Sequence, residues 1–402
     1  MELVGLEEIS AAREVLRGVV RDTPLAHSAV LEQRCGVPVH LKCENLQRTG
    51  SFKIRGAYVR IHRLSGAERA RGVVAASAGN HAQGVALAAT MLGTTATVFM
   101  PVTAPLPKLA ATRGYGAQVH QVGEVFEESL AAARDFAAGT GAVFIHPFDH
   151  PDVLAGQGTV GLEVLEQLPD VGTVVVPTGG GGLLSGIAAA VKGVKPDVRV
   201  IGVQARDAAA WPASLAAGKP VRLPKPHTVA DGLSVAQPGA VTFAHVSTLV
   251  DEMLTVGEEE LSRALLLCLE RAKLVVEPAG AAAVAALLQH PVRLPGPVCA
   301  VLSGGNIDPL LLMRVIRHGL GAGGRFLALR VTMPDRPGEL AALLARVGAA
   351  GANVVDVAHS RTSGTLALGD VVIALSLETR GPQHCHELVA DLRAAGYALT
   401  RS

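Results

Sequence analysis

The chain has 402 residues, of which 49% are hydrophobic and 18% are charged, and this apolar content excludes an intrinsically disordered chain. Lysine and arginine (36) nearly balance aspartate and glutamate (35), so the charge does not indicate a nucleic-acid partner. The length suggests two or three domains.

The cysteines and the pattern of apolar runs indicate a cytoplasmic protein. Five cysteines are scattered without a CxxC pair, which disfavours a disulfide framework or a structural zinc site. The N-terminus has no basic region before an apolar run, so we expect no signal peptide. An uncharged run at 171–191 has the length of a membrane span, but Pro177 and four glycines interrupt it; we therefore expect no membrane association.

Short apolar runs alternate with helix-length segments through the first 320 residues, and this alternation predicts an α/β fold with parallel sheets. The predicted strands are 73–76, 96–100, 142–145, 173–176, 198–203 and 298–302, and clear helical segments are 124–138 and 158–168. Such strands are apolar throughout because helices cover both faces of the sheet. Ligands then bind at the carboxyl ends of the strands.

The pattern changes after a glycine-rich stretch at 318–325, which is typical of a linker. The remaining residues predict a βαββαβ module. Its elements are a strand (326–333), a helix (337–348), two strands (353–360 and 368–377), a helix (383–395) and a final strand.

Lys53 is the lysine with the most unusual surroundings. Phe52 and Ile54 flank it, and partial removal of its amine from water would lower its pKa and make it nucleophilic. Local residues alone equally allow a lysine that begins a helix and extends its amine into solvent.

A run of four glycines at 179–182 follows a predicted strand and precedes a predicted helix. Consecutive backbone N–H groups at a helix N-terminus bind phosphate without a basic side chain. The run is neither a P-loop nor a dinucleotide motif, because the lysine and the acidic partner of those motifs are missing. A simple tight turn is the alternative.

Two further polar turns follow strands, at 77–81 (SAGNH) and at 303–306 (SGGN). The first offers hydroxyl, amide and backbone donors at a helix start, which suits a carboxylate or a polar ring substituent. An ordinary helix cap or turn explains each of them when it is taken alone. A lysine, a phosphate-binding loop and two polar turns are, together, the parts that hold pyridoxal phosphate.

Five motifs in order give the chain a resemblance to a known family. SFKIRGA, SAGNHAQG, TGGGGLLSG, ADGL (230–233) and SGGN resemble those of fold-type II pyridoxal-phosphate enzymes, and specifically of threonine ammonia-lyases (threonine dehydratases). The resemblance covers about Arg21 to Arg317. The loop DRPGEL (335–340) and the βαββαβ order resemble an ACT regulatory domain.

The resemblance implies a fold of two parallel-sheet subdomains, like that of the tryptophan synthase β subunit, followed by a ferredoxin-like ACT domain. It implies a catalytic domain at 1–320, with a smaller subdomain at roughly 49–150 inserted in the larger one. A glycine-rich linker at 321–325 would join it to the ACT domain at 326–402.

The resemblance also implies roles for the residues that match its motifs. Lys53 would form the internal aldimine with pyridoxal 5′-phosphate and then remove the proton from the substrate Cα. Phe52 would lie against the cofactor ring, and Asn80 would bind the ring 3′-oxygen. Ser77, Asn80 and His81 would surround the substrate carboxylate.

By the same resemblance, the phosphate would be bound by Gly179, Gly180, Gly181, Gly182 and the amide of Leu183, and Ser303 would face the pyridine nitrogen. A hydroxyl does not keep that nitrogen protonated as an aspartate would, so the ring is a weaker electron sink. This favours β-elimination, in which the leaving hydroxyl removes the charge. The expected reaction converts L-threonine to 2-oxobutanoate and ammonia, and L-serine to pyruvate.

Three alternatives stay open. A serine racemase needs a second acid–base group where racemases of this fold have a serine, and here that position is Ala78, whose methyl group cannot transfer a proton. L-Serine as the main substrate differs by one methyl group, which a pocket discriminates by only ~1–3 kcal/mol. The third alternative is a catalytically inactive amino-acid sensor.

No metal is predicted: Gln204 stands where related enzymes can carry a cation-binding glutamate, and a neutral amide is a poor ligand for Mg²⁺. For the tail, the resemblance implies an amino-acid effector, isoleucine opposed by valine, and a homodimer or homotetramer. The implied effector residues are Asp335, Pro337, Gly338, Glu339, Leu340 and Asn353. A tail that only stabilises an oligomer is the alternative.

Overall fold

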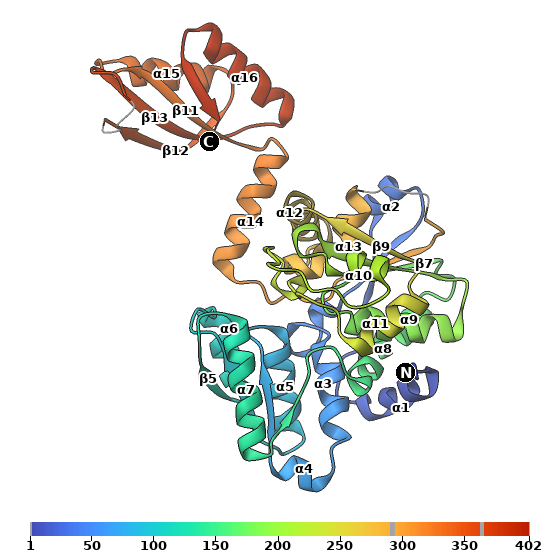
Figure 1. The fold of residues 1–402 in the computed structure, drawn as a ribbon. Helices are drawn as coiled ribbons and strands as arrows, with labels where there is room; N and C mark the ends of the chain where they lie inside the picture. Colours follow the sequence, from blue (N-terminus) through green and yellow to red (C-terminus); the bar gives the residue numbers. More distant parts are fainter. Residues whose placement is uncertain (1, 290–293, 362–365, 402) are drawn as a thin grey trace. The chain divides into compact units, whose positions relative to one another are not determined.

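In the computed structural model, residues 2–289, 294–361 and 366–401 are described, and they form three β-sheets. The chain divides into two units, Met1–Leu312 and Met313–Ser402. The first unit holds two sheets of mainly parallel strands, and the second holds one antiparallel sheet. The predicted combination of a parallel α/β fold with a βαββαβ module is confirmed (Figure 1).

The larger sheet has six strands in the order β1-β2-β10-β7-β8-β9. Only β1 runs antiparallel to its neighbour. Strands β7 and β10 are buried along their whole length, which explains why their sequences are apolar throughout. The bounds are β1 Leu25–His27, β2 Val39–Lys42, β7 Thr173–Pro177, β8 Arg199–Ala205, β9 Glu252–Val256 and β10 Val298–Val301.

The smaller sheet is fully parallel, with the order β5-β4-β3-β6. Its strands are β3 Val73–Ala76, β4 Ala96–Met100, β5 Gln118–Gln121 and β6 Val143–Phe144. The sequence did not predict β5, because it lies at the sheet edge and is mostly exposed, so it lacks the apolar signal of a buried strand. Figure 1 shows α5 and α7 beside this sheet.

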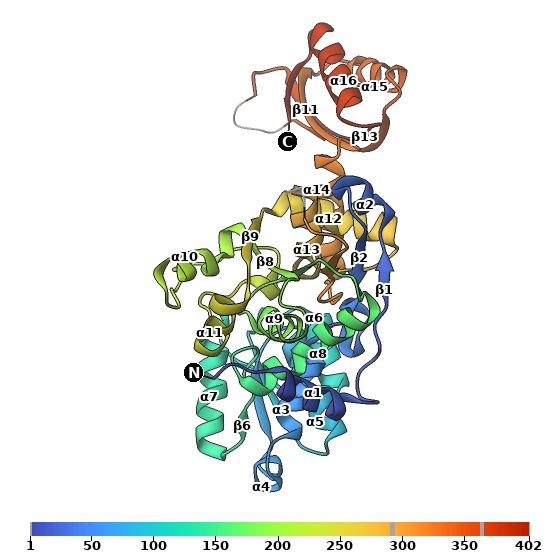
Figure 2. The same ribbon diagram turned by 90° about the vertical axis from the view of Figure 1, so that its right-hand side faces the viewer.

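Helices surround both sheets of the first unit (Figures 1 and 2). Their bounds are α1 Leu6–Leu16, α2 Ala29–Cys35, α3 Lys53–His62, α4 Gly66–Ala70, α5 Asn80–Met91, α6 Leu106–Gly114, α7 Phe126–Thr140, α8 Pro151–Gln167, α9 Gly182–Val194, α10 Ala210–Ala217, α11 Ala240–Leu249, α12 Glu258–Leu267 and α13 Pro278–Gln289. A further helix, α14 Pro309–Ala322, contains the boundary between the two units. Short 3₁₀ turns are η1 Glu44–Leu46, η2 Arg48–Gly50, η3 Arg206–Ala208 and η4 Asp231–Leu233, and a π-helical turn is η5 Cys268–Ala272.

Helix α8 begins at Pro151, two turns before the predicted start at residue 158. Glycines in its first half serve close packing between helices. A Cβ added to Gly156 would lie 2.6 Å from the Cα of Gly56 in α3, so only glycine lets the two helix backbones approach this closely.

A buried network of charges ties β2, η1, α3 and α8 together. Arg55 donates to both carboxylate oxygens of Glu44 at 2.9 Å, and to Glu163 at 2.6 and 3.0 Å. Lys42 donates to Glu163 at 2.7 Å. The side chains of Arg55, Glu44 and Lys42 are fully buried. Arg55 lies two residues after Lys53, so the network holds the start of α3 against the larger sheet.

The second unit follows the order β11-α15-β12-β13-α16-β14, as predicted. Its sheet order is β12-β13-β11-β14, with Leu329 of β11 opposite Leu375 of β13. Buried residues alternate along β11 and β13, and Figure 2 shows α15 and α16 on one side of the sheet. The bounds are β11 Phe326–Pro334, α15 Glu339–Ala349, β12 Asn353–Ser360, β13 Asp370–Glu378, α16 Pro382–Ala394 and β14 Ala398–Arg401.

The glycine-rich stretch at 318–325 is not irregular along its whole length. Helix α14 continues through Ala322, so two residues of the predicted linker, 321 and 322, are helical. The apolar and charged residues that precede the glycines drive this helix, and its last turns continue through them until Gly324 takes a positive φ of 65°.

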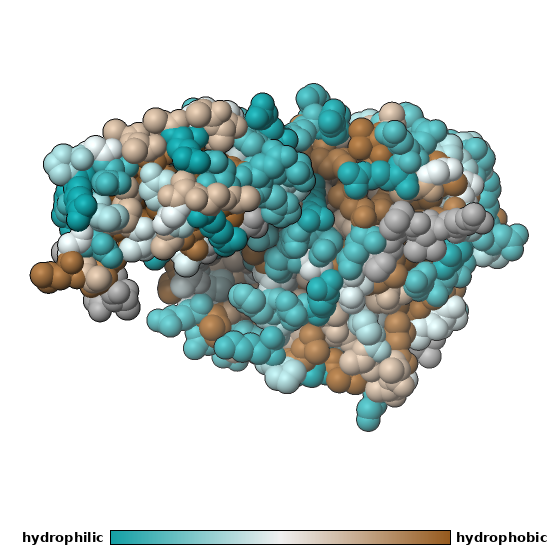
Figure 3. Space-filling view, turned by 90° about the horizontal axis from the view of Figure 1, so that it is seen from above, coloured by the Kyte–Doolittle hydropathy of each residue, from teal (hydrophilic) through white to brown (hydrophobic). Residues whose placement is uncertain are grey.

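No helix in the described ranges is long and apolar enough to cross a membrane. The face in Figure 3 carries hydrophilic residues interspersed with smaller hydrophobic areas.

Candidate active site

All nine residues predicted to contact the cofactor line a single pocket of the first unit. They are Phe52, Lys53, Asn80, Gly179, Gly180, Gly181, Gly182, Leu183 and Ser303. The pocket holds about 460 Å³ of space, its open mouth included. Strands β7 and β10 are neighbours in the sheet, so the turns that follow them meet at the same edge.

Lys53 is the first residue of α3, and its amine reaches the pocket. Its Nζ donates to the carbonyl of Pro147 at 2.7 Å and lies 5.1 Å from the centroid of the Phe52 ring. Burial lowers the pKa of Lys53 to about 8, although the charge of Glu277 opposes this shift. A lysine with this pKa is partly neutral near neutral pH and can act as a nucleophile or a base.

The loop before Lys53 is strained and is held by the turn after β10. Thr49 has a φ of 62°, and Gly50 has a φ of 71°; the left-handed conformation is unfavourable for a β-branched threonine. Ser51 forms an isolated bridge with Gly304, and the Phe52 amide donates to the carbonyl of Ser303 at 3.2 Å. Two motifs that are about 250 residues apart in sequence thus form one wall of the pocket.

The glycine run joins β7 to α9 where no larger residue would fit. A Cβ added to Gly180 would lie 2.4 Å from the Phe148 ring, and one added to Gly181 would lie 2.4 Å from the Trp211 ring. Gly181 has a φ of 94° and caps the N-terminus of α9. The free N–H groups of this helix end are therefore available to an anion with no side chain in between.

Asn80 and Ser303 complete the polar part of the pocket. Asn80 begins α5, and its amide nitrogen donates to Glu277 at 2.6 Å. Ser303 is 5% exposed, and its hydroxyl makes no hydrogen bond within the described ranges. A buried hydroxyl with unused hydrogen-bonding capacity is suited to a polar group of a ligand.

The structure does not bring Ser77 and His81 into the lining of this pocket. The Ser77 hydroxyl accepts a hydrogen bond from the Gly79 amide at 3.1 Å. The His81 ring is buried and bonds through Nε2 to the carbonyl of Ile145 at 2.8 Å. Burial, with a smaller contribution from Lys53, lowers the pKa of His81 to about 3. His81 is therefore a neutral residue that joins α5 to the loop after β6.

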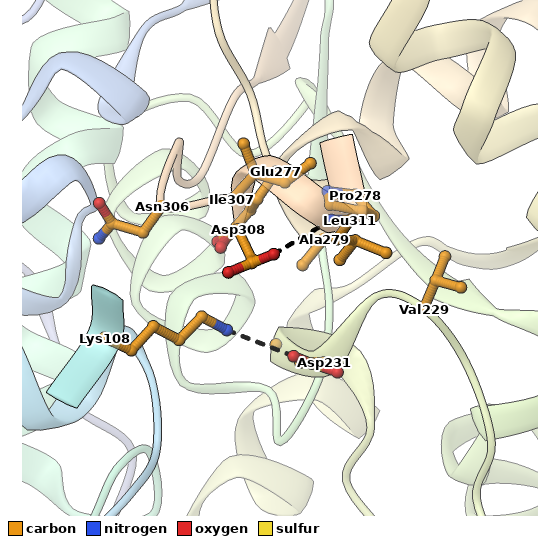
Figure 4. Close-up of a pocket in the computed structure, with 11 residues that line it drawn as sticks. Lys108, Val229, Asp231, Glu277, Pro278, Ala279, Asn306, Ile307, Asp308 and Leu311 are labelled. Atoms are coloured by element: carbon orange, nitrogen blue, oxygen red, sulfur yellow. Dashed lines mark hydrogen bonds and ion pairs between the residues drawn. The ribbon is translucent and has the colours of Figure 1, made fainter. Parts of the chain in front are cut away.

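A second, smaller pocket adjoins the first and shares Gly232, Glu277 and Ala279 with it (Figure 4). Lys108 of α6 and Asp231 of η4 form an ion pair of 3.3 Å across it. The motif ADGL thus contributes to both pockets through its glycine.

A comparison with family models decides which family this architecture represents. Residues 16–304 match the model described as pyridoxal-phosphate dependent enzyme. The chain belongs to this family.

Individual members of the pyridoxal-phosphate dependent family are similar to the chain over most of its length. It is 50% identical to the L-threonine ammonia-lyase of Thermotoga maritima, over 98% of both chains. Among solved structures, it is 44% identical to a threonine deaminase from T.th., with a TM-score of 0.72 over 76% of this chain and 99% of that one. Maize serine racemase is 34% identical, with a TM-score of 0.74 over 80% and 99%. The resemblance to threonine ammonia-lyases that the motifs indicated is confirmed.

The residues of the larger pocket fit the cofactor of the family. A cofactor with an aldehyde, a phosphate and a ring nitrogen requires an amine, an anion-binding loop and a small polar group. The pocket contains Lys53, the glycine run and Ser303. A Cβ would collide with the Gly232 carbonyl at Gly179, with the Phe148 ring at Gly180 and with the Trp211 ring at Gly181. This cradle explains why four glycines stand in a row.

Several residues of the two pockets received no role in the sequence analysis. Phe148 and Leu233 line the larger pocket, Glu277 lines both, and Asn306 lines the smaller one; Leu233 and Asn306 belong to the motifs ADGL and SGGN. A signal existed for Glu277, a carboxylate in the apolar run VVEPAG, where a charged residue without a function is rare. Phe148 gave no signal, since a phenylalanine in a loop is as often part of a core.

Gln204 has a structural role next to the glycine run. Its Oε1 accepts a hydrogen bond from the Trp211 amide at 2.9 Å, and the Trp211 ring nitrogen donates to the carbonyl of Gly179 at 2.8 Å. Gln204 is fully buried. It supports the tryptophan that in turn packs against the glycines.

The residues predicted to bind an effector are not all brought together: Asp335 to Leu340 follow the end of β11, whereas Asn353 pairs with Glu378, which lies opposite Phe326 at the start of β11 and so at the other end of the sheet. Asp335 accepts from Arg361 Nε at 2.7 Å. Gly338 takes a φ of 93° before α15, Asn353 begins β12, and Leu340 packs against the core. The remaining two residues of this set are Pro337, in the loop, and Glu339, the first residue of α15.

Proposed function

We propose that the chain catalyses the β-elimination of L-threonine to 2-oxobutanoate and ammonia, and acts on L-serine to give pyruvate. The observation that carries the proposal is the meeting of the Lys53 amine, the glycine run and the Ser303 hydroxyl in one pocket. The threonine ammonia-lyase from Thermotoga maritima, 50% identical over 98% of both chains, supports it.

When bound, pyridoxal phosphate would supply an electron sink for the substrate Cα. The amides of the glycine run and of Leu183 would bind the phosphate, and Asn80 and Ser303 would hold the polar ring substituents. Phe52, beside the Lys53 amine, would shield one side of the ring from water.

Lys53 would take the proton from the substrate Cα at its Nζ atom, because the lowered pKa of this amine, about 8, leaves a neutral fraction near neutral pH. The substrate then loses its β-hydroxyl as water. Addition of water to the unsaturated product releases ammonia and leaves the 2-oxoacid. One water is lost and one is gained, so the net change is the loss of ammonia.

Ala78 favours elimination over racemisation. Racemisation needs a proton donor on the side of the substrate opposite Lys53, and the methyl group of Ala78, which packs against the core of the smaller sheet, cannot supply one. Maize serine racemase is nevertheless similar in structure, so L-serine ammonia-lyase and serine racemase are the second candidates.

The test is a steady-state assay of 2-oxoacid and D-serine formation from L-threonine and L-serine. It compares wild type, Lys53→Ala and the surface control Lys195→Ala. We expect oxoacid from both substrates, a loss of at least about 10²–10⁴-fold in Lys53→Ala, and no change in Lys195→Ala. A folded, cofactor-loaded protein without oxoacid formation would refute the lyase, and D-serine formation would then identify a racemase. A folded chain that binds no cofactor would indicate the sensor.

For the domains, we propose that residues 1–320 carry catalysis and that 326–402 form an ACT domain that binds isoleucine, opposed by valine, in a homodimer or homotetramer. Its βαββαβ order and the loop at 335–340 support this. The same assay, repeated with isoleucine, tests it. We expect Asn353→Ala to weaken the response to isoleucine more than the α16 surface control Gln383→Ala does. Equal responses in both variants would count against the proposed effector site.

A further inference from the structure

The Asn80 amide lies in a chain of hydrogen bonds that crosses the wall between the two pockets. Its Nδ2 donates to Glu277 Oε1 at 2.6 Å, and its Oδ1 accepts from Asn306 Nδ2 at 2.7 Å. Asn306 Nδ2 also donates to the carbonyl of Thr49 at 2.5 Å. Figure 4 shows Glu277 and Asn306 among the residues around the smaller pocket.

The groups at the two ends of this hydrogen-bond chain decide how the side-chain amides of Asn306 and Asn80 are oriented. The Thr49 carbonyl can only accept a hydrogen bond, so Asn306 must turn its NH₂ group toward it. The second N–H of that group then serves the oxygen of Asn80. This directs the NH₂ group of Asn80 to Glu277, whose carboxyl group keeps an acceptor oxygen in either protonation state. A reversed Asn80 amide would set its oxygen against Glu277 and its nitrogen against that of Asn306.

The arrangement leaves one donor unused. Asn80 Nδ2 has two N–H groups, and Glu277 takes one of them. The other has no partner within the described residues, and Asn80 lines the larger pocket. A donor without a protein partner at a pocket wall is available to a ligand oxygen.

We propose that Glu277 and Asn306 are positioning residues that hold the Asn80 amide with its nitrogen, and not its oxygen, available to the ligand. The inference rests on the proposed function, in which the ligand oxygen belongs to the pyridoxal ring. Because Asn306 also holds the carbonyl of the strained Thr49, it connects this amide to the loop that carries Lys53.

The test measures the affinity of the cofactor-free chain for pyridoxal phosphate and the absorption band of the bound cofactor. It uses Asn306→Ala and Asn306→Asp. Alanine removes one donor but leaves Glu277 to orient Asn80, so we expect affinity about threefold weaker. Aspartate places a carboxylate against two acceptors, the Thr49 carbonyl and the Asn80 oxygen, and therefore favours the reversed Asn80 amide. We expect affinity at least about tenfold weaker, which is the loss of one hydrogen bond, and a shifted band.

Asn45→Asp is the matched control. Asn45 is also buried and also donates to a backbone carbonyl, that of Val275, at 3.1 Å. It makes no hydrogen bond to Asn80 within the described ranges, so we expect wild-type cofactor affinity and an unshifted band in this variant.

Glu277→Gln and Glu277→Leu provide a second, independent pair. Glutamine retains a carbonyl oxygen for Asn80, so we expect affinity within about threefold of wild type, whereas leucine should lose about tenfold. This pair keeps the inference testable if Asn306→Asp does not fold. Circular dichroism of the cofactor-free variants establishes folding.

Equal affinities for Asn306→Ala and Asn306→Asp, or for Glu277→Gln and Glu277→Leu, would overturn the inference, because a merely structural role does not depend on the acceptor or donor character of the new side chain. If wild type binds the cofactor and forms oxoacid while these variants match it, this inference alone fails. If wild type binds no pyridoxal phosphate, the proposed function fails and this inference fails with it.

Discussion

The two units of the chain differ in where they place charged groups. The first unit has ion pairs at its surface, such as Arg17–Glu14, but it also buries some charged side chains completely, among them Arg55, Glu44 and Lys42. In the second unit, the ion pairs Arg346–Asp391 and Asp335–Arg361 lie at the surface. Burying a charged side chain costs free energy unless the charge is paired. The first unit therefore contains buried charges that fix the positions of its elements, where apolar side chains would pack more simply.

The sheets differ in the same sense. Strands β3, β7 and β10 of the first unit are buried along their whole length, and the residues that carry chemistry lie in the turns after them. Strands of the second unit alternate between buried and less buried residues, and one apolar core explains most of their sequence. Residues that packing alone does not explain, such as a buried carboxylate or a run of glycines, therefore indicate function mainly in the first unit.

Among the variants that compare the two units, loss of a buried ion pair should change the free energy of unfolding most. We expect Arg55→Met to lower the free energy of unfolding by about 3–5 kcal/mol, because Glu44 and Glu163 would stay buried without their partner. The chain has one tryptophan, Trp211, in the first unit, so urea unfolding followed by its fluorescence reports on that unit. Arg346→Met removes an exposed pair of the second unit and should leave unchanged the urea transition followed by circular dichroism, which reports on both units. Similar effects of the two variants would break the comparison.

Acid should destabilise the first unit before the second. Burial lowers the pKa of His81 to about 3 and that of His146 to about 4, whereas an unfolded histidine titrates near 6.5. The unfolded chain therefore binds more protons below that pH, and stability falls as the pH falls from 6.5 toward 4. His81 alone should account for about 3 kcal/mol over this range.

The measurement for this prediction is urea unfolding, followed by Trp211 fluorescence, between pH 7 and pH 4. His81→Gln should flatten the pH dependence, because the amide can still donate to the carbonyl of Ile145 but does not titrate. In the second unit, the hydrogen bond from Arg346 lowers the pKa of Asp391 below its ordinary value of 3.8, so its contribution is lost only at lower pH. A wild-type curve that is flat from pH 6.5 to pH 4 would contradict the prediction.

Glycine-to-alanine changes should give the smallest effects. One change should weaken cofactor binding, and the other should stabilise the chain. Gly180→Ala forces a methyl group into the Phe148 ring, and we expect the affinity for pyridoxal phosphate to fall at least about tenfold. Gly348, in α15, has open space around it, so Gly348→Ala should stabilise the chain by about 0.5–1 kcal/mol. Titration with the cofactor and thermal unfolding measure the two effects. Equal tolerance at both positions would show that the glycine run is not a tight cradle.

Much of the fold was predictable because the signals are local. The apolar runs at 73–76, 96–100 and 173–176 are strands within one residue of their predicted ends, and the order of elements predicted after residue 326 is that of the second unit. Strands β1, β2, β5 and β9 were not predicted; β1 and β2 are short, and β5 and β9 are partly exposed. The start of helix α8 was predicted seven residues too late, and the packing role of its glycines is a property that no local pattern reveals.

By itself, the sequence determined the candidate lysine, from its apolar neighbours, and the glycine run and the serine after β10, from their places directly after predicted strands. The partners of these residues were decided only by the tertiary structure. Glu277 and Asn306 are 197 and 226 residues away from Asn80, and only the packed sheets bring them within hydrogen-bond distance. The direction of an amide depends on donors and acceptors that surround it in space, and the order of residues along the chain does not contain that information.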